Sequence, residues 1–129
     1  MFEQSGLQAV ALWAGLHLAT TLVLALNVVR RRLGQDPDPD GPLHKAVRAH
    51  GNNIEYVPII LLGQVVLALM GTDTVFIHAA LGSLWLARLC HAWGIQQPKT
   101  PHPAGVIGNL VTWTVMLLTA GLLLIEAFA

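Results

Sequence analysis

Three polar residues able to grip a charged ligand follow one another at helical spacing in an otherwise apolar region. Arg48, Asn52 and Glu55 are separated by four and three positions, so they share one face of a helix. A guanidinium binds a carboxylate through its fork, and a carboxylate accepts hydrogen bonds from an ammonium or amide group. Tyr56 flanks these three residues, here called the polar stripe. The polar stripe predicts a site for a zwitterionic ligand.

A structural role for the polar stripe is the alternative. Arg48 and Glu55 have opposite charges, and each would neutralise the other in a network between helices. Seven residues span about 10 Å along a helix axis, which is too far for a direct ion pair without an intermediary such as Asn52. Residue spacing alone leaves ligand binding and a structural network equally open.

A second pair of polar residues lies near the end of another apolar segment. Arg88 and His91 are three positions apart and therefore share a helix face. As a structural alternative, Arg88 would extend its head group to the membrane surface and His91 would lie at the interface. This pair is expected at the same membrane level as Arg48, so we expect it to join the polar stripe in one site. The single cysteine, Cys90, argues against a cysteine-rich metal site, and we expect no bound metal.

The elements that position these residues are expected to be membrane-spanning helices. Hydrophobic residues make up 54% of the 129-residue chain and charged residues 11%, which is too little polar surface for a small soluble domain. A span needs about 20 mostly apolar residues, because the hydrocarbon core is about 30 Å thick. We therefore expect an all-α membrane protein, a single four-helix domain over residues 1–129. Its expected spans are about 7–29, 45–70, 74–93 and 105–128.

Basic residues indicate how the spans are oriented. They flank two of the three loops, at residues 34–44 and 94–104, whereas the turn at 71–74 and both termini lack lysine and arginine. Positive charge favours the cytoplasmic side, so we expect both loops in the cytoplasm and both termini opposite. The zero net charge gives no reason to expect nucleic acid as a partner. A compact chain without a cleavable signal suits a bacterial inner membrane.

The segment RAHGNNIEYVPIILLG resembles the second helix of the MAPEG family, the membrane-associated proteins of eicosanoid and glutathione metabolism. The family pattern Arg-xxx-Asn-xx-Glu falls on the polar stripe, and Tyr56 matches a tyrosine found in some members. A second family pattern, Arg-xx-His, falls on Arg88 and His91. The resemblance extends over the whole chain in length, number of spans and loop placement.

The resemblance implies a homotrimer that binds glutathione between neighbouring subunits near the cytosolic face. It implies glutathione as co-substrate, membrane lipids as surroundings and an apolar or lipid-like second substrate. One of Arg30, Arg31 and Arg32 would reach a glutathione carboxylate. The other glutathione-binding residues implied by the resemblance are Arg48, Asn52, Glu55, Tyr56, Arg88 and His91.

One departure from the family bears on catalysis. Active members resemble one another in having an arginine near the start of the fourth helix that stabilises the glutathione thiolate. The segment 94–108 contains no arginine, only Lys99 and His102 as candidates for that role. A cation near sulfur raises the thiolate fraction, so its loss should slow transfer. The expected function is a glutathione transferase or peroxidase acting on apolar electrophiles. The alternative is a non-catalytic member that binds glutathione or lipid, or that acts as a scaffold.

Two further classes of protein are alternatives to a glutathione-dependent function. A small multidrug exporter has similar size and four spans, but it would need a membrane-buried glutamate in the first span, and residues 7–29 contain no acidic residue. Haem ligation by His50 and His91 is the other possibility. His50 lies roughly 160° around the helix from Arg48, which turns it away from the polar stripe.

Overall fold

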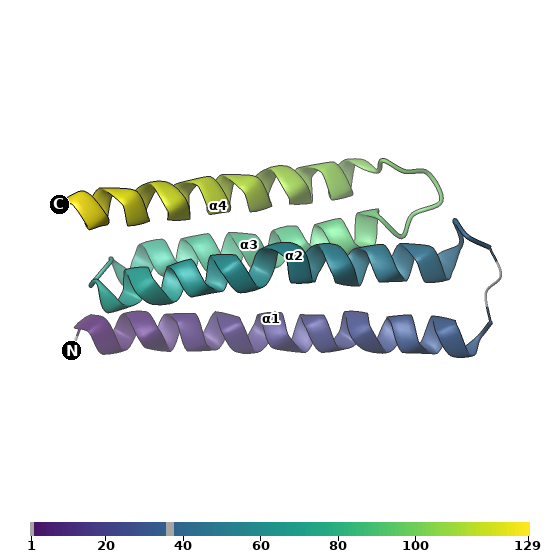
Figure 1. Cartoon of the computed structure of the whole chain (residues 1–129), viewed down its shortest axis with the longest axis horizontal. Coiled ribbons are helices and arrows are strands. Elements are labelled where there is room, and N and C mark those ends of the chain that lie inside the picture. Colours follow the sequence, from purple (N-terminus) through teal and green to yellow (C-terminus); the bar gives the residue numbers. More distant parts are fainter. Residues whose placement is uncertain (1, 36–37) are drawn as a thin grey trace.

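Four long antiparallel helices make up the protein, as the computed structural model shows for residues 2–35 and 38–129 (Figure 1). The helices are α1 (Phe2–Leu33), α2 (Pro42–Leu69), α3 (Thr74–Gly94) and α4 (Pro103–Phe128). All four are long and apolar enough to cross a membrane, which confirms the expected fold class. Many large apolar side chains are exposed, among them Leu18, Val23 and Leu117. Such an outer surface suits lipid and not water.

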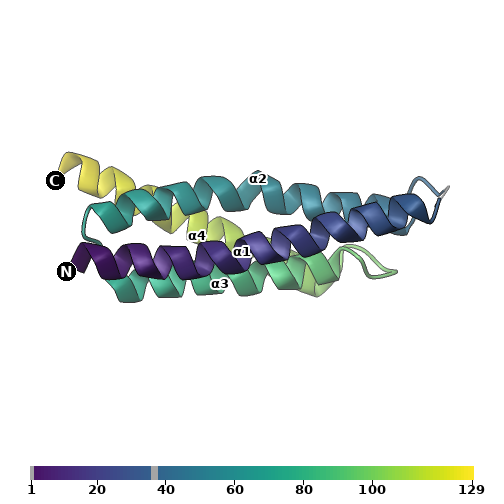
Figure 2. The same cartoon turned by 90° about the horizontal axis from the view of Figure 1, so that it is seen from below.

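The helices α2 and α3 form the middle of the bundle, with α1 and α4 on opposite sides of them (Figures 1 and 2). Each outer helix contacts both middle helices, whereas α1 and α4 make no contact in the described part of the chain. Both termini and the α2–α3 turn lie at one end of the bundle (Figure 1). The α1–α2 and α3–α4 loops lie at the other, here called the loop end.

Local sequence explains where the helices begin and end. Gly71 takes a positive φ of 83° at the end of α2, a conformation that glycine adopts without steric cost. Asp73 then caps α3, because its Oδ1 accepts a hydrogen bond from the backbone nitrogen of Val75 at 2.7 Å. Pro42 and Pro103 each begin a helix, where the missing N–H has no intrahelical partner to lose.

The bundle interior contains apolar clusters in both halves, but most of its buried polar side chains lie toward the loop end. The main apolar cluster includes Val10 of α1, Ile60 of α2, Leu81 of α3 and Val115 of α4. Toward the loop end the buried side chains include Asn52, Asn53, Arg88, His91 and Thr112. Buried polar groups in a membrane protein must be paired with one another, so this half of the bundle is where the chain departs from simple packing.

Glycines bring α3 and α4 into direct contact beside this polar half. A Cβ atom on Gly108 would lie 2.5 Å from the backbone oxygen of Ala87 and 2.8 Å from the backbone nitrogen of His91. Similarly, a Cβ on Gly94 would overlap the backbone of Gly105. Small residues at such crossings let helix backbones approach closely within the membrane.

Replacing Gly108 by alanine is therefore expected to force α3 and α4 apart. The free energy of unfolding in detergent should fall by about 1–3 kcal/mol, the usual cost of overpacking. Gly121→Ala, on the same helix, is the matched control because no atom lies within 4 Å of its Cβ position. Thermal unfolding followed by circular dichroism compares the two. Equal stability of both variants would contradict the close contact.

Candidate functional site

Arg88 is completely buried between the helices and donates hydrogen bonds to three of them. Its Nη2 donates to Asn52 Oδ1 at 2.6 Å and lies 3.1 Å from His91 Nδ1. Its Nε donates to Asn53 Oδ1 at 3.4 Å, and its Nη1 lies 3.5 Å from Thr112 Oγ1. One guanidinium on α3 thus links α2 and α4 and also a neighbouring turn of its own helix.

The groups that form hydrogen bonds with Arg88 are polar but uncharged. Its hydrogen-bond partners are two amides, a hydroxyl and an imidazole. The Tyr56 ring centroid lies 5.9 Å from the guanidinium carbon, within the range of a cation–π contact. A second bond extends this network to α1, because Asn53 Nδ2 donates to Thr21 Oγ1 at 2.9 Å. The hydrogen-bond network around the Arg88 charge therefore includes side chains from every helix of the bundle.

The guanidinium determines how its neighbours are oriented, because arginine can only donate. Nδ1 of His91 must accept from Arg88, so the ring proton of a neutral His91 sits on Nε2. In the same way the Asn52 oxygen faces Arg88, and its amide nitrogen is left to donate elsewhere. Arg88 therefore acts on its surroundings by orienting His91 and Asn52.

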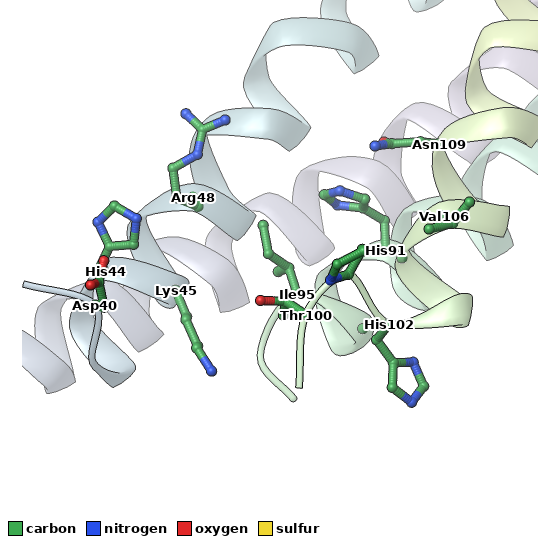
Figure 3. A pocket seen from close by; sticks show the side chains of 13 residues that line it. Asp40, His44, Lys45, Arg48, His91, Ile95, Thr100, His102, Val106 and Asn109 are labelled. Atoms are coloured by element: carbon green, nitrogen blue, oxygen red, sulfur yellow. The ribbon is translucent and has the colours of Figure 1, made fainter. Parts of the chain in front are cut away.

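A cavity of about 550 Å³ lies at the loop end, beside this network (Figure 3). It is bounded by the start of α2, the end of α3, the α3–α4 loop and the first turns of α4. Its side-chain lining consists of Asp40, His44, Lys45, Arg48, His91, Ile95, Thr100, Pro101, His102, Val106 and Asn109. The volume falls within the range of about 300–1,000 Å³ that is common for small-molecule sites.

Basic side chains line the α2 side of the cavity. His44, Lys45 and Arg48 come from the first two turns of α2, with Asp40 as the acidic residue in the lining. Lys45 Nζ donates to the backbone oxygen of Gln97 at 2.7 Å, which ties α2 to the α3–α4 loop. Arg48 is exposed and carries its charge at the cavity wall. This arrangement favours an anionic ligand group at the α2 side.

The structure separates the members of the predicted polar stripe. Arg48 lines the cavity, whereas Asn52 is buried against Arg88. Glu55 is exposed on the outer surface of α2, and Tyr56 is half-buried under Arg88. Within a single chain, the cavity therefore brings together Arg48 and His91 and leaves Glu55 facing outward.

The two residues considered for thiolate stabilisation lie in different places. Lys99 is exposed in the α3–α4 loop and is absent from the cavity lining. His102 lines the cavity, but its Nδ1 accepts from the backbone nitrogen of Ala104 at 3.2 Å as the cap of α4. Its ring also packs edge-on against Trp93, with ring centroids 5.0 Å apart. These contacts indicate a structural role for His102 at the start of α4.

The arginines at the end of α1 line neighbouring hollows. Arg30 Nη2 donates to Asn27 Oδ1 at 3.1 Å on the outer side of α1. Arg31 lines a cavity of about 370 Å³ that shares Lys45 and Asp40 with the larger one. Of the two arginines, Arg31 is thus the nearer to the main cavity.

Asn109 is a cavity residue that the sequence reasoning did not single out. It lies in the second turn of α4, and its Oδ1 is buried without a hydrogen-bond partner in the described part of the chain. The signal was present as a lone amide in the otherwise apolar segment GNLV. Polar residues inside a span are candidates for function by default, and that criterion would have found it.

Comparison with known proteins identifies the family of the chain. The sequence pattern of the MAPEG family matches residues 10–125. The chain belongs to the MAPEG family. It is 30% identical over 112 residues to "Inner membrane protein YecN" of Escherichia coli strain K12, covering 84% of each chain. The protein of the same name from Escherichia coli O6:H1 strain CFT073 matches to the same extent. No solved structure matches the chain.

Removing the buried guanidinium of this MAPEG protein is expected to destabilise it. Arg88→Leu should lower the free energy of unfolding by about 3 kcal/mol, because Asn52 and Asn53 would lose their partner while still buried. Cys90→Ala, an exposed change two residues away, serves as the control and should leave stability nearly unchanged. Denaturant unfolding in detergent measures both. An Arg88→Leu protein as stable as the wild type would show that the network contributes nothing.

Proposed function

We propose that this chain is a membrane-embedded glutathione-binding protein that acts as a glutathione transferase or peroxidase on apolar electrophiles from the bilayer. The observation that carries the proposal is the cavity in which Arg48 and His91 meet, in a chain that belongs to the MAPEG family. Glutathione would serve as co-substrate. The second substrate would enter from the lipid, where apolar side chains cover the outer surface.

The chemistry of glutathione suits the cavity. The tripeptide carries two carboxylates, one ammonium group and two amides. The basic α2 side offers Lys45 and Arg48 to a carboxylate, and Asp40 offers a carboxylate to the ammonium group. Asn52 and Arg88 would support the ligand from behind the wall by holding its neighbours in place.

We also propose that the protein assembles as a homotrimer whose subunits share the site. Glu55 lies halfway along a spanning helix and is exposed, next to exposed apolar residues such as Ile54 and Ile59. A carboxylate that faces lipid at that depth is energetically unfavourable. We therefore expect a second copy of the chain to pack against Glu55 and shield it from lipid. Glu55, Tyr56 and an arginine at the end of a neighbouring α1 would then complete the ligand contacts.

The assembly can be tested by native mass spectrometry of the detergent-purified protein. At low collision energy, complexes of three chains should be released from the detergent micelle. Glu55→Leu should also give complexes of three chains if apolar contacts dominate the interface. A protein that stays monomeric at every concentration would contradict the proposed assembly.

The orientation of the protein in the membrane is inferred from the distribution of its basic residues. Basic residues gather at the loop end, and we propose that this end faces the cytoplasm of a bacterium, with both termini on the opposite side of the inner membrane. A cytoplasmic site would have direct access to soluble glutathione.

A non-catalytic role in binding glutathione or lipid is the second candidate. It is favoured by the absence of arginine from residues 94–108 and by the position of Lys99 outside the cavity lining. Detection of a glutathione conjugate with an apolar electrophile would decide for the enzyme.

Calorimetry of glutathione binding to the detergent-purified protein tests the proposed function. Wild type should bind at millimolar affinity or tighter. Arg48→Ala and Glu55→Ala should each weaken binding about tenfold or more, because the loss of a charged hydrogen-bond partner costs roughly 1.5–3 kcal/mol.

Glu126→Ala is the matched control, since it removes a carboxylate at the opposite end of the bundle. It should bind glutathione like the wild type. If neither the wild type nor any variant binds glutathione, the proposed function is wrong, although the fold would be unaffected.

A further inference from the structure

A hollow on the outer side of α1 is separate from the cavity in which Arg48 and His91 meet. Its volume is about 410 Å³, and it lies between the last turns of α1 and Gln96, two residues beyond the end of α3. Its lining consists of Val23, Leu24, Leu26, Asn27, Arg30 and Gln96. No residue of this lining also lines the larger cavity. The volume is in the range that is common for small-molecule sites.

The hollow is apolar along α1 and basic at its loop end. Val23 and Leu26 are exposed apolar residues of its lining, and Leu24 is a buried one. Arg30 follows Leu26 by about one helical turn, in the direction of the loop end (Figure 1). One turn advances about 5.4 Å along a helix axis. An aliphatic group in the hollow would therefore lie close to a guanidinium.

Hydrogen bonds hold Arg30 at the edge of the hollow. Its Nη2 donates to Asn27 Oδ1 at 3.1 Å, and Asn27 Nδ2 donates to Gln96 Oε1 at 3.2 Å. Gln96 Nε2 in turn donates to the backbone oxygen of Ala92 at 2.7 Å. These three bonds connect the guanidinium of α1 to the end of α3. A side chain that is already restrained loses less conformational freedom when it binds a ligand.

Most of the hydrogen-bonding capacity of Arg30 remains available. A guanidinium has five N–H donors, and Asn27 is the one acceptor that Arg30 has among the described residues. The side chain is exposed, and no described carboxylate forms an ion pair with it. Arginine binds the oxygens of a phosphate group through two parallel N–H bonds. The hollow therefore offers a cation to a phosphate and, beside it, an apolar surface.

We propose that this hollow binds an anionic phospholipid of the surrounding leaflet. Arg30 binds the phosphate of the headgroup, and part of one acyl chain packs against Val23 and Leu26. A soluble anion would not use the apolar part of the lining, and an apolar molecule would not use the Arg30 donors. The site goes beyond the proposed glutathione function. Arg31 lines the hollow that contains Lys45, so it remains available to glutathione.

A headgroup with net negative charge is favoured over a zwitterionic one. Three consecutive arginines, Arg30, Arg31 and Arg32, end α1. They attract the phosphate but repel the ammonium group that a zwitterionic headgroup also carries. Basic residues at the ends of membrane-spanning helices favour anionic lipids for this reason. Phosphatidylglycerol should therefore bind more tightly than phosphatidylcholine with the same acyl chains.

Native mass spectrometry of the detergent-purified protein, with lipid added in steps, measures this preference. Each chain of the wild type should bind one phosphatidylglycerol about tenfold more tightly than one phosphatidylcholine, since a bond to a charged group contributes roughly 1.5 kcal/mol or more. Equal affinity for the two lipids would overturn the proposal.

Charge variants distinguish a defined site from general attraction to the basic end of α1. Arg30→Gln should abolish most of the preference for phosphatidylglycerol, a loss of about tenfold. Arg32→Gln is the matched control, because it removes the same charge from the same helix end but lies outside the lining of the hollow. This control should keep most of the preference. Equal losses in the two variants would show nonspecific attraction and no defined site.

A substitution in the apolar part of the lining tests whether an acyl chain enters the hollow. Leu26→Trp places a larger side chain there and should weaken the binding of both lipids. Leu12→Trp is the control, because Leu12 is exposed to a similar extent, 54% against 57%, and lies outside the lining. Thermal unfolding should show equal stability of the two variants, since both positions are exposed. Wild-type binding of phosphatidylglycerol by Leu26→Trp would contradict the proposed site.

Competition with soluble anions separates a lipid site from a site for free phosphate or glutathione. Glycerol phosphate carries the phosphate without the acyl chains, and in large molar excess it should leave phosphatidylglycerol bound. Glutathione in the same excess should also leave the lipid bound, because the larger cavity shares no lining residue with the hollow. Displacement of the lipid by either compound would overturn the assignment to a phospholipid.

Discussion

Arg88 places a permanent positive charge inside a bundle that is otherwise surrounded by apolar side chains and lipid. A charge in that position is tolerated only if the neighbouring helices bring acceptors to it. Asn52 and Asn53 do so from α2 and Thr112 does so from α4, while Thr21 supports Asn53 from α1. At the loop end, these hydrogen bonds connect all four helices in one network.

The same requirement separates the two halves of the bundle. Near the termini, apolar residues such as Ile60, Leu81 and Val115 pack without orientational preference. Near the loops, Arg88 fixes the orientation of Asn52 and His91, and Gly108 lets α3 and α4 approach closely. Directional bonds hold side chains in single orientations, which is what a binding site needs.

The cavity of this MAPEG protein has basic side chains on its α2 side and His91 and Asn109 on the side of α3 and α4. Cations on α2 favour an anionic group on that side, while Arg88 fixes the ring orientation of His91 on the side of α3.

Hydropathy determined four spans, and the composition of the loops determined where they end, because a lipid environment permits few alternatives to an apolar helix. Helical spacing also placed Arg88 and His91 on one face. Tertiary structure alone decided that Asn52 turns inward to Arg88, that Glu55 faces outward and that Asn109 lines the cavity. Spacing along one helix gives the angle between its residues, but it does not give the direction in which the neighbouring helices lie. That direction is set by contacts such as the one between Gly108 and the α3 backbone.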